Sequence, residues 1–268
     1  MTGSQTLLIH LGGLGDVCIS ESAFLSLSRH FGKPSTAVGV RRVLEEFAAY
    51  FAGCASIDSR TWAYLFSPSL EGPRWQRIIF FGKDRSGSLR QRLSLLCGEL
   101  IFIDMYPDEE KVPAEEYQLG QVGRYGATPV KAIFPRRPSD RIILYPEKGS
   151  TKRKWPVDRF LEVFARLKER GLNVLLLAPP GLPLSVPHEE VPRGLRDVAA
   201  CFSQGGVFFS NDSGMAHFAA RCGLRPLTLF WDADPVVWSP RGSLVLVCQK
   251  EAPTIEEVED FITSGMEG

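Results

Sequence analysis

Short apolar runs of strand length alternate along this chain with stretches whose apolar residues recur at the 3.6-residue period of a helix. This alternation is typical of a layered α/β protein with parallel strands. In the first half it predicts strands at 6–11, 35–40, 76–81 and 99–105, with helices between them. A glycine-rich turn follows the first run, and the pattern then predicts a helix from about Gly15 to Phe31.

A proline-rich, charged segment at 129–138 interrupts the pattern and predicts a boundary between domains of 1–137 and 138–268. A second alternating block follows, with a first strand at 141–145. Four further runs predict strands at 173–178, 207–210, 226–231 and 244–248. Most of these are too continuously apolar to leave a solvated face, so we expect central strands.

Two helices in the second block have clear end signals. The helix predicted from Pro156 to Arg170 has apolar residues at i, i+3, i+4 and i+7 from Phe160, a proline suited to its first position and Gly171 just after it. The other, at 254–264, begins with a capping box of Thr254 and Glu257, and it could pack back on the first domain. Because both halves repeat strand, loop and helix, we expect two Rossmann-like domains facing a cleft.

Composition narrows the class of protein. The 268 residues are 44% hydrophobic, enough to fill a sizeable core, and 31 basic residues balance 31 acidic ones, which argues against a nucleic-acid binder. No apolar run reaches the roughly 18 residues of a membrane span, and the run at 7–11 is too short for a secretory signal, so we expect a cytoplasmic protein. The six cysteines lie far apart without metal-site spacing, which predicts reduced thiols.

The first candidate site is the Leu11–Asp16 turn between the first strand and the first helix. Its glycines let backbone N–H groups approach an anion closely, and Asp16 could act as a general base toward a bound hydroxyl. Alternatively, Asp16 only complements the helix dipole. Cys18 stands where a dinucleotide fingerprint has its third glycine. Arg41 and Arg42 after the second strand could still hold a 2′-phosphate, so an NADP-dependent oxidoreductase stays open.

The second candidate is the basic segment 147–156, which precedes the first helix of the second half. Cations at a helix start oppose the dipole, so their presence favours a bound anion such as a diphosphate. A solvated basic loop is the alternative. The predicted donor-binding residues here are Ser150, Thr151, Lys152, Arg153 and Lys154.

The third candidate is the turn at 209–220. Asp212 or Ser213 can cap the following helix, while N–H groups of Ser213 and Gly214 face a ligand and His217 lies one turn further on the same side. The alternative is a simple cap with a core-facing histidine. The loop with Trp231-Asp232-Ala233-Asp234-Pro235 and Trp238-Ser239-Pro240 follows the next strand, so we expect it to border the same cleft.

Taken in order, these stretches resemble the heptosyltransferase-like family (glycosyltransferase family 9), which transfers heptose from an ADP-sugar to the lipopolysaccharide inner core. The resemblance covers nearly the whole chain. It rests on a first strand followed by Gly15-Asp16, a basic segment ending in Lys154-Trp155-Pro156, and Asp212-Ser213-Gly214-x-x-His217, with the Asp-Pro and Trp-x-Pro loop after them.

The resemblance implies a GT-B fold, donor binding on the second domain, acceptor binding mainly on the first, and inversion at the anomeric carbon without a metal. Asp16 matches the family's catalytic base, and Arg153 or Lys154 its phosphate-binding cation. Asp212, Ser213, Gly214 and His217 match the donor diphosphate loop, and we add Gly13 and Gly15 as donor-binding candidates. No cofactor is implied, since the ADP-sugar or other nucleotide sugar is a substrate.

The implied partners are this nucleotide sugar and a glycolipid or glycan acceptor, with at most peripheral contact at the inner face of the cytoplasmic membrane and no nucleic acid. The chain departs from the family's pattern at 178–206, a short segment with five prolines where the family has a ribose-contacting acid. Glu189 or Glu190 could replace that acid. Glu21-Ser22 stand where the family has a proline after Gly-Asp. A non-catalytic relative that binds a nucleotide or a partner protein is the second hypothesis.

Overall fold

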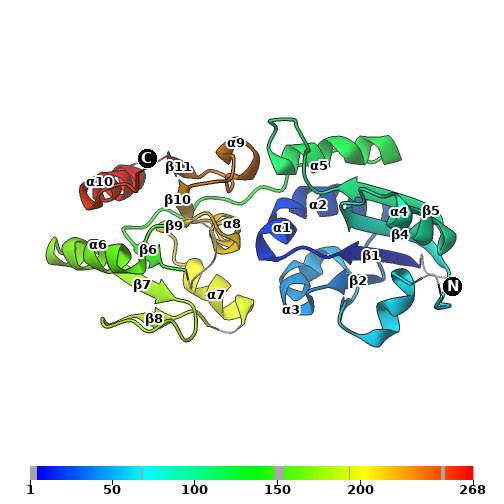
Figure 1. Ribbon diagram of the computed structural model, residues 1–268, viewed down its shortest axis with the longest axis horizontal. Coiled ribbons are helices and arrows are strands. Elements are labelled where there is room, and N and C mark those ends of the chain that lie inside the picture. The colour runs from blue at the N-terminus through cyan, green and yellow to red at the C-terminus, as the bar shows by residue number, and fades with distance from the viewer. Residues whose placement is uncertain (1–4, 68, 148–153, 193, 249–250, 268) are drawn as a thin grey trace. The chain divides into compact units, whose positions relative to one another are not determined.

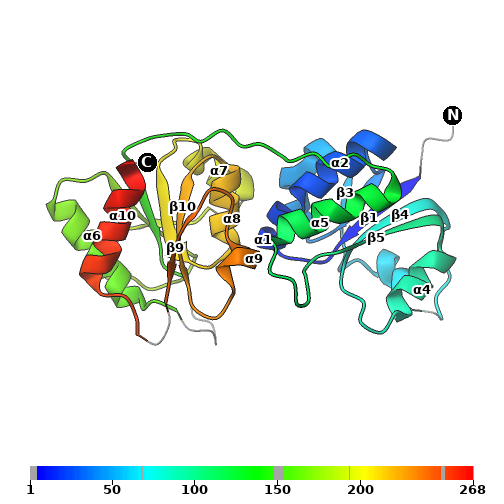
Figure 2. The ribbon, with the colours of Figure 1, turned by 90° about the horizontal axis from the view of Figure 1, so that it is seen from above.

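The computed structural model describes residues 5–67, 69–147, 154–192, 194–248 and 251–267. The chain divides into two compact units, Met1–Ala132 and Ile133–Gly268. The division falls inside the proline-rich 129–138 segment and ahead of the boundary predicted after residue 137. Each unit contains its own parallel sheet with helices on both faces (Figures 1 and 2).

The sheet of the first unit has five parallel strands in the order β3-β2-β1-β4-β5. They are β1 (Thr6–His10), β2 (Thr36–Gly39), β3 (Cys54–Ser56), β4 (Trp75–Gly82) and β5 (Cys97–Asp104). The register pairs Leu8 of β1 with Ala37 of β2 on one side and with Ile79 of β4 on the other. The four predicted strands are confirmed, whereas β3 is three residues long and carries no readable period.

Helices cover both faces of this sheet. In chain order they are α1 (Leu14–Ile19), α2 (Glu21–Phe31), α3 (Arg41–Leu44), η1 (Glu45–Tyr50), η2 (Arg60–Leu65), α4 (Ser88–Leu95), α5 (Ala114–Val122) and η3 (Gly123–Tyr125). Helices α2 and α5 lie side by side over one face, and α4 lies on the other (Figure 2). There Leu93 of α4 and Tyr64 of η2 bury against Ile78 and Phe80 of β4.

The single helix predicted from Gly15 to Phe31 is two helices, because the chain turns at Ser20. Ser20 is fully buried and its hydroxyl donates to the backbone carbonyl of Asp16 at 2.9 Å. Its Oγ also lies 3.0 Å from Nε2 of His10. A serine hydroxyl that bonds the carbonyl four residues back bends a helix, and here the bend separates α1 from α2.

The second unit has a six-stranded parallel sheet in the order β11-β10-β9-β6-β7-β8. Its strands are β6 (Ile142–Tyr145), β7 (Val174–Ala178), β8 (Glu189–Glu190), β9 (Val207–Asn211), β10 (Arg225–Phe230) and β11 (Leu244–Val247). The five predicted strands are confirmed, but β11 lies at an edge rather than in the centre, and Val247 is half exposed. Its apolar run covers one flank of the core, as the packing of Leu244 and Leu246 shows.

Helices α6 (Val157–Glu169) and α10 (Ile255–Glu267) cover one face of this sheet, and α7 (Leu195–Phe202) and α8 (Gly214–Arg221) cover the other (Figures 1 and 2). The short α9 (Pro235–Trp238) follows β10. Pro156 is the N-cap of α6 rather than its first residue, and Gly171 after it has a positive φ of 75°.

The terminal helix α10 has the predicted capping box. The Thr254 N–H donates to Glu257 Oε2 at 2.7 Å, and the Glu257 N–H donates to Thr254 Oγ1 at 3.2 Å. Val258 and Ile262 of this helix are fully buried in the core of the second unit, so its apolar face packs against the sheet of its own unit. An apolar face predicts that a helix packs, but not against which sheet.

The six cysteines all lie among the described residues and none is joined in a disulfide; Cys18, Cys97 and Cys248 are buried, and the other three are partly buried. Within the described residues, no helix combines the length and the apolar character needed to cross a membrane.

Candidate active site

In both units the predicted site residues follow strands beside the point where the order of strands reverses. In the first unit this point lies between β1 and β4, and Asp16 follows β1. In the second it lies between β6 and β9, which are followed by Lys154 and by Asp212. Open parallel sheets bind ligands at the carboxyl ends of the strands beside such a switch point.

The carboxylate of Asp16 is held at both oxygens. Asp16 is the third residue of α1, and its Oδ2 accepts the N–H of Gly13 at 2.8 Å. Its Oδ1 accepts the hydroxyl of Tyr106, which follows β5, at 2.6 Å. These two hydrogen bonds give the side chain a defined orientation. Because Asp16 is also partly exposed, its carboxylate remains accessible to a substrate hydroxyl. The Gly13 N–H, predicted to contact the donor, bonds to Asp16, and Gly15 lies within the first turn of α1.

Tyr106 keeps its proton. Burial raises the pKa of its phenol well above the usual value, and the hydrogen bond to Asp16 and the charge of that carboxylate raise it further. Tyr106 is therefore a hydrogen-bond donor at neutral pH and not a base.

A buried histidine supports the backbone beneath Asp16. The Gly12 N–H donates to Nδ1 of His10 at 3.2 Å, so the ring proton resides on Nε2, which faces Ser20 Oγ. Burial lowers the pKa of His10 to about 3, against an opposing hydrogen bond with the backbone, and the ring is uncharged. Because Ser20 donates in turn to the Asp16 carbonyl, these bonds join the glycine turn to the end of α1.

In the second unit, Asn211 connects three loops at the ends of neighbouring strands. This side chain ends β9 and is 2% exposed. Its Oδ1 accepts the backbone N–H of Trp155 at 2.9 Å and the indole N–H of Trp231 at 3.1 Å. The loop after β6, the start of α8 and the loop after β10 are thereby brought together at one edge of the second sheet.

Of the five predicted donor-binding residues in the basic segment, Lys154 is the one within the described part of the chain, and it forms an ion pair. Its Nζ bonds to Oε2 of Glu147, and both side chains are about four-fifths buried, with exposures of 21% and 19%. Ser150, Thr151, Lys152 and Arg153 lie outside the described residues.

Of the two predicted caps, Asp212 and Ser213, the N-cap of α8 is Ser213. Its Oγ accepts the Ala216 N–H at 3.3 Å, and the Asp212 N–H donates to the Leu229 carbonyl at 2.9 Å. Gly214 is the first residue of the helix, where N–H groups have no acceptor within the helix.

His217 lies one turn along α8. Burial and then the nearby charge of Arg241 lower the pKa of its ring to about 4, against a hydrogen bond with the Trp238 backbone. At neutral pH the ring is therefore uncharged and adds no positive charge to the site.

The two acids proposed for the ribose lie at the same edge of the second sheet. Glu189 and Glu190 form β8, which pairs with the last two residues of β7, and both are exposed. The proline-rich segment after β7 therefore places two acidic residues beside the carboxyl end of β7.

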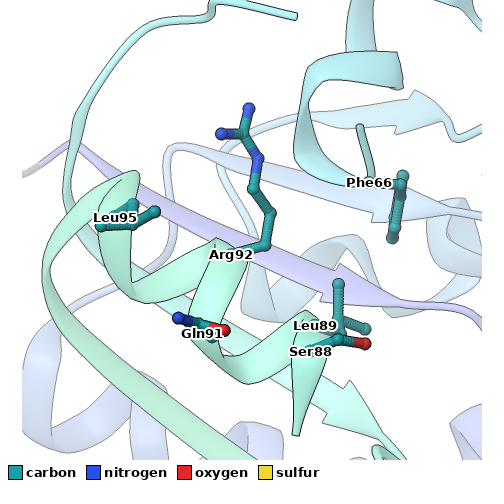
Figure 3. A pocket seen from close by; sticks show the side chains of 6 residues that line it. All are labelled: Phe66, Ser88, Leu89, Gln91, Arg92 and Leu95. Carbon is teal, nitrogen blue, oxygen red and sulfur yellow. The ribbon is translucent and has the colours of Figure 1, made fainter. Parts of the chain in front are cut away.

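A separate apolar cavity of about 670 Å³ lies between α4 and the end of η2 (Figure 3). Phe66, Leu89 and Leu95 line it, and Arg92 beside them donates to the carbonyls of Tyr64 and Leu70. None of the predicted site residues contributes to it. In the described ranges there is also no group of three histidine, cysteine or acidic side chains that could hold a metal ion.

Four residues at these edges were given no role of their own by the sequence analysis, although Glu147 and Asn211 lie within the segments that it singled out. They are His10, Tyr106, Glu147 and Asn211, and each acts on a predicted site residue or on its neighbour. Tyr106 had a usable signal, because it directly follows the strand predicted at 99–105, at the end of the strands where open α/β sheets bind ligands.

No family model matches the sequence, and no curated protein matches it. In three dimensions the chain is similar to the glycosyl transferase family 9 protein from Veillonella parvula DSM 2008, with a TM-score of 0.68 and 14% identity over 92% of this chain and 86% of that one. E. coli heptosyltransferase WaaC, solved with ADP, gives a TM-score of 0.67 at 15% identity, with 97% and 99% covered. E. coli ADP-heptose lps heptosyltransferase II gives 0.66 at 12% identity, with 98% of each chain covered.

These three structures share their fold with this chain across nearly the whole of its length. The chain therefore has the GT-B fold of the heptosyltransferases, and the resemblance drawn from its motifs is confirmed at the level of the fold.

Proposed function

We propose that the protein is an inverting, metal-independent glycosyltransferase that moves a heptose-like sugar from a nucleoside-diphosphate sugar to a lipopolysaccharide-type or other glycan acceptor. The observation that carries this proposal is the carboxylate of Asp16. It follows β1 at the switch point of the first sheet, it is accessible, and hydrogen bonds at both oxygens orient it.

In the proposed reaction, Asp16 takes the proton of an acceptor hydroxyl as that oxygen attacks the anomeric carbon. The bond from the anomeric carbon to the diphosphate breaks on the opposite face, so the configuration inverts. The nucleoside diphosphate leaves with the bonding electron pair, and the proton resides on Asp16. The second unit supplies donor binding through Lys154 and the start of α8, with Arg153 assigned by the motif.

Two further features support the substrate classes. E. coli WaaC was solved with ADP and with ADP-2-deoxy-2-fluoro heptose, which favours a nucleoside diphosphate as part of the donor. Arg41, Arg42, Glu45 and Asp58 line a cavity of about 550 Å³ after β2, and this polar lining of both charges suits a glycan acceptor. A glycolipid acceptor would place the reaction at the inner face of the cytoplasmic membrane.

The direct test combines binding with turnover. Melting temperatures are measured with ADP-, UDP-, GDP- and TDP-sugars, because a ligand that binds the folded state raises its stability. ADP-heptose with a heptose-free lipopolysaccharide core is then assayed for ADP release and for product by mass spectrometry. Turnover supports the enzyme, binding without turnover over the whole panel favours the non-catalytic relative, and stabilisation by NADP alone favours an oxidoreductase.

We predict that transfer does not need a divalent cation. Side-chain cations and helix N–H groups stabilise the departing diphosphate in the proposed mechanism, the role that a metal plays in other transferases. Dialysis against EDTA should therefore change kcat by less than about twofold, and added Mg²⁺ or Mn²⁺ should not restore a lost rate. Loss of turnover with EDTA and its return with Mg²⁺ would contradict metal independence.

Opposite effects on ADP affinity are expected at the two ends of the Glu147–Lys154 pair. Lys154→Met removes a charge that contacts phosphate and should weaken ADP binding about tenfold, or about 1.4 kcal/mol. Glu147→Gln frees Lys154 and removes a repelling carboxylate, so it should tighten binding. Calorimetry with ADP measures both. The exposed Lys131–Glu116 pair gives a control, since Lys131→Met should leave ADP affinity unchanged. Weaker binding by Glu147→Gln would reject this role of the pair.

A methyl group at Gly12 should displace the base. An added Cβ would lie 2.5 Å from Cβ and 2.7 Å from Oδ2 of Asp16, closer than the atoms can approach. Because a shift of about 1 Å in a reacting group can lower a rate about a hundredfold, Gly12→Ala should lower kcat at least tenfold and leave ADP affinity unchanged. Gly120→Ala is the matched control, because its Cβ would meet no atom within 4 Å. Normal turnover in Gly12→Ala would show that the position of Asp16 does not limit the reaction.

A further inference from the structure

The hydrogen bond from Tyr106 to Asp16 joins side chains from opposite ends of the first unit's sequence. We propose that Tyr106 is a positioning residue, whose hydroxyl holds Asp16 Oδ1 so that the carboxylate meets the acceptor hydroxyl in one fixed orientation. This inference rests on the proposed function and deepens it, since Tyr106 acts through the base and not on the substrate.

The other bond of the carboxylate cannot fix it alone. Gly13 donates to Oδ2 from within the same helix start, so this contact belongs to the local cap and moves with α1. Tyr106 approaches from β5, on the far side of β4 from β1, and supplies a reference point outside the helix. With one donor on each oxygen, rotation of the carboxyl plane breaks at least one bond, while each oxygen keeps a further lone pair for a proton.

The backbone that carries Tyr106 is firmly anchored. The Asp104 N–H donates to Oε1 of Gln121 at 2.9 Å, and Nε2 of Gln121 donates back to the Asp104 carbonyl at 2.9 Å. Nε2 of Gln118 donates to the Met105 carbonyl at 3.0 Å. Both glutamines are on α5 and are buried, so α5 fixes the two residues that precede Tyr106. A side chain on backbone that is hydrogen-bonded to a helix in this way can hold its partner more precisely than a side chain on an unsupported loop.

The chemistry of the phenol fits this role better than that of a proton carrier. Burial and the Asp16 carboxylate raise the pKa of Tyr106, so the hydroxyl stays protonated throughout the reaction. The proton from the acceptor therefore goes to Asp16, and Tyr106 donates the same hydrogen bond before and after transfer.

The test is Tyr106→Phe, which keeps the ring and removes the hydroxyl. With ADP-heptose and heptose-free lipopolysaccharide core, kcat should fall about 10- to 100-fold while KM for ADP-heptose stays within about twofold. Tyr125→Phe is the matched control: among the described residues its hydroxyl bonds only the backbone of Phe102, at 3.0 and 3.1 Å, so its loss should lower stability without lowering kcat. In an Asp16→Asn background, Tyr106→Phe should lower the residual rate no further, since both act through one group.

Retention of kcat in Tyr106→Phe, where Asp16→Asn abolishes transfer, would overturn the positioning role. An equal further loss in the Asp16→Asn background would also overturn it. The failure of the proposed function is a separate outcome, because it appears as a lack of turnover in the wild type. In that case urea unfolding of the wild type, Tyr106→Phe, Asp16→Ala and the double variant still decides on the contact, because alanine leaves no group for the Tyr106 hydroxyl: non-additive midpoints support the contact, and additive midpoints refute it.

Discussion

Replacing Asp16 with asparagine is expected to lower kcat at least a hundredfold. The amide cannot take the proton of the acceptor hydroxyl, and loss of a general base typically lowers a rate about 10²- to 10⁴-fold. Asparagine keeps the shape of the side chain, and its oxygen can still accept the Gly13 N–H, while the Tyr106 hydroxyl can turn to accept from the amide nitrogen. Turnover and ADP affinity are measured separately, and only turnover should change.

A second carboxylate near a helix start gives the control for this substitution. Asp84 accepts the Arg90 N–H at 2.7 Å beside α4 and belongs to no proposed site. Asp84→Asn makes the same chemical change and should leave kcat unaltered. If Asp16→Asn retains more than about a hundredth of the wild-type rate with an unchanged melting temperature, Asp16 is not the base.

The largest effect on stability is expected at Asn211. Asn211→Leu removes the oxygen that accepts from the Trp155 and Trp231 N–H groups, and leucine offers no replacement. Each buried donor left without an acceptor costs about 1–3 kcal/mol, so with two such donors the free energy of unfolding of the second unit should fall by about 2–6 kcal/mol. The measurement is urea unfolding followed by amide hydrogen exchange in peptides from β9 and β10.

Thr228→Val separates this effect from the general removal of a buried polar group. Thr228 lies on β10 directly beside Ser210, is fully buried, and its hydroxyl is without a hydrogen-bond partner among the described residues. Its removal leaves no donor unsatisfied and should not destabilise the second unit. Equal losses in the two variants would mean that Asn211 does not join the loops. In the expected case ADP affinity falls with Asn211→Leu alone, because the Trp155 N–H also positions the adjacent Lys154.

The alternating pattern predicted the long strands and the main helices, because burial of one face produces a characteristic spacing of apolar residues in each: two residues in a strand and 3.6 in a helix. It could not predict β3 and β8, since runs of three and two residues have no period to read. The bend at Ser20 depends on a hydrogen bond from a serine that is unremarkable in sequence. The edge position of β11 and the packing of α10 depend on which neighbour an apolar face meets, and that choice is made by the whole sheet.

In the candidate site, too, the features created by the local sequence could be predicted, and the contacts between distant segments could not. Gly-rich turns and helix starts after strands identified Asp16 and Ser213 from local sequence, because the local chain itself creates those positions. The partner of Asp16 could not be found in this way, since Tyr106 is brought to it by the order of strands β1, β4 and β5. Asn211 was visible within its motif, but its role depends on two tryptophans from other loops.

The two cores have a consequence for how such a protein can change over generations. Leu7, Phe80 and Leu93 pack within the first unit, whereas Trp155, Phe209 and Val258 pack within the second, so a substitution in either core leaves the other intact. Under the proposed division of labour, preference for a nucleotide sugar and preference for an acceptor are inherited as separate traits. Substitutions in the second unit can then change the preferred nucleotide sugar while the preference for the acceptor stays the same.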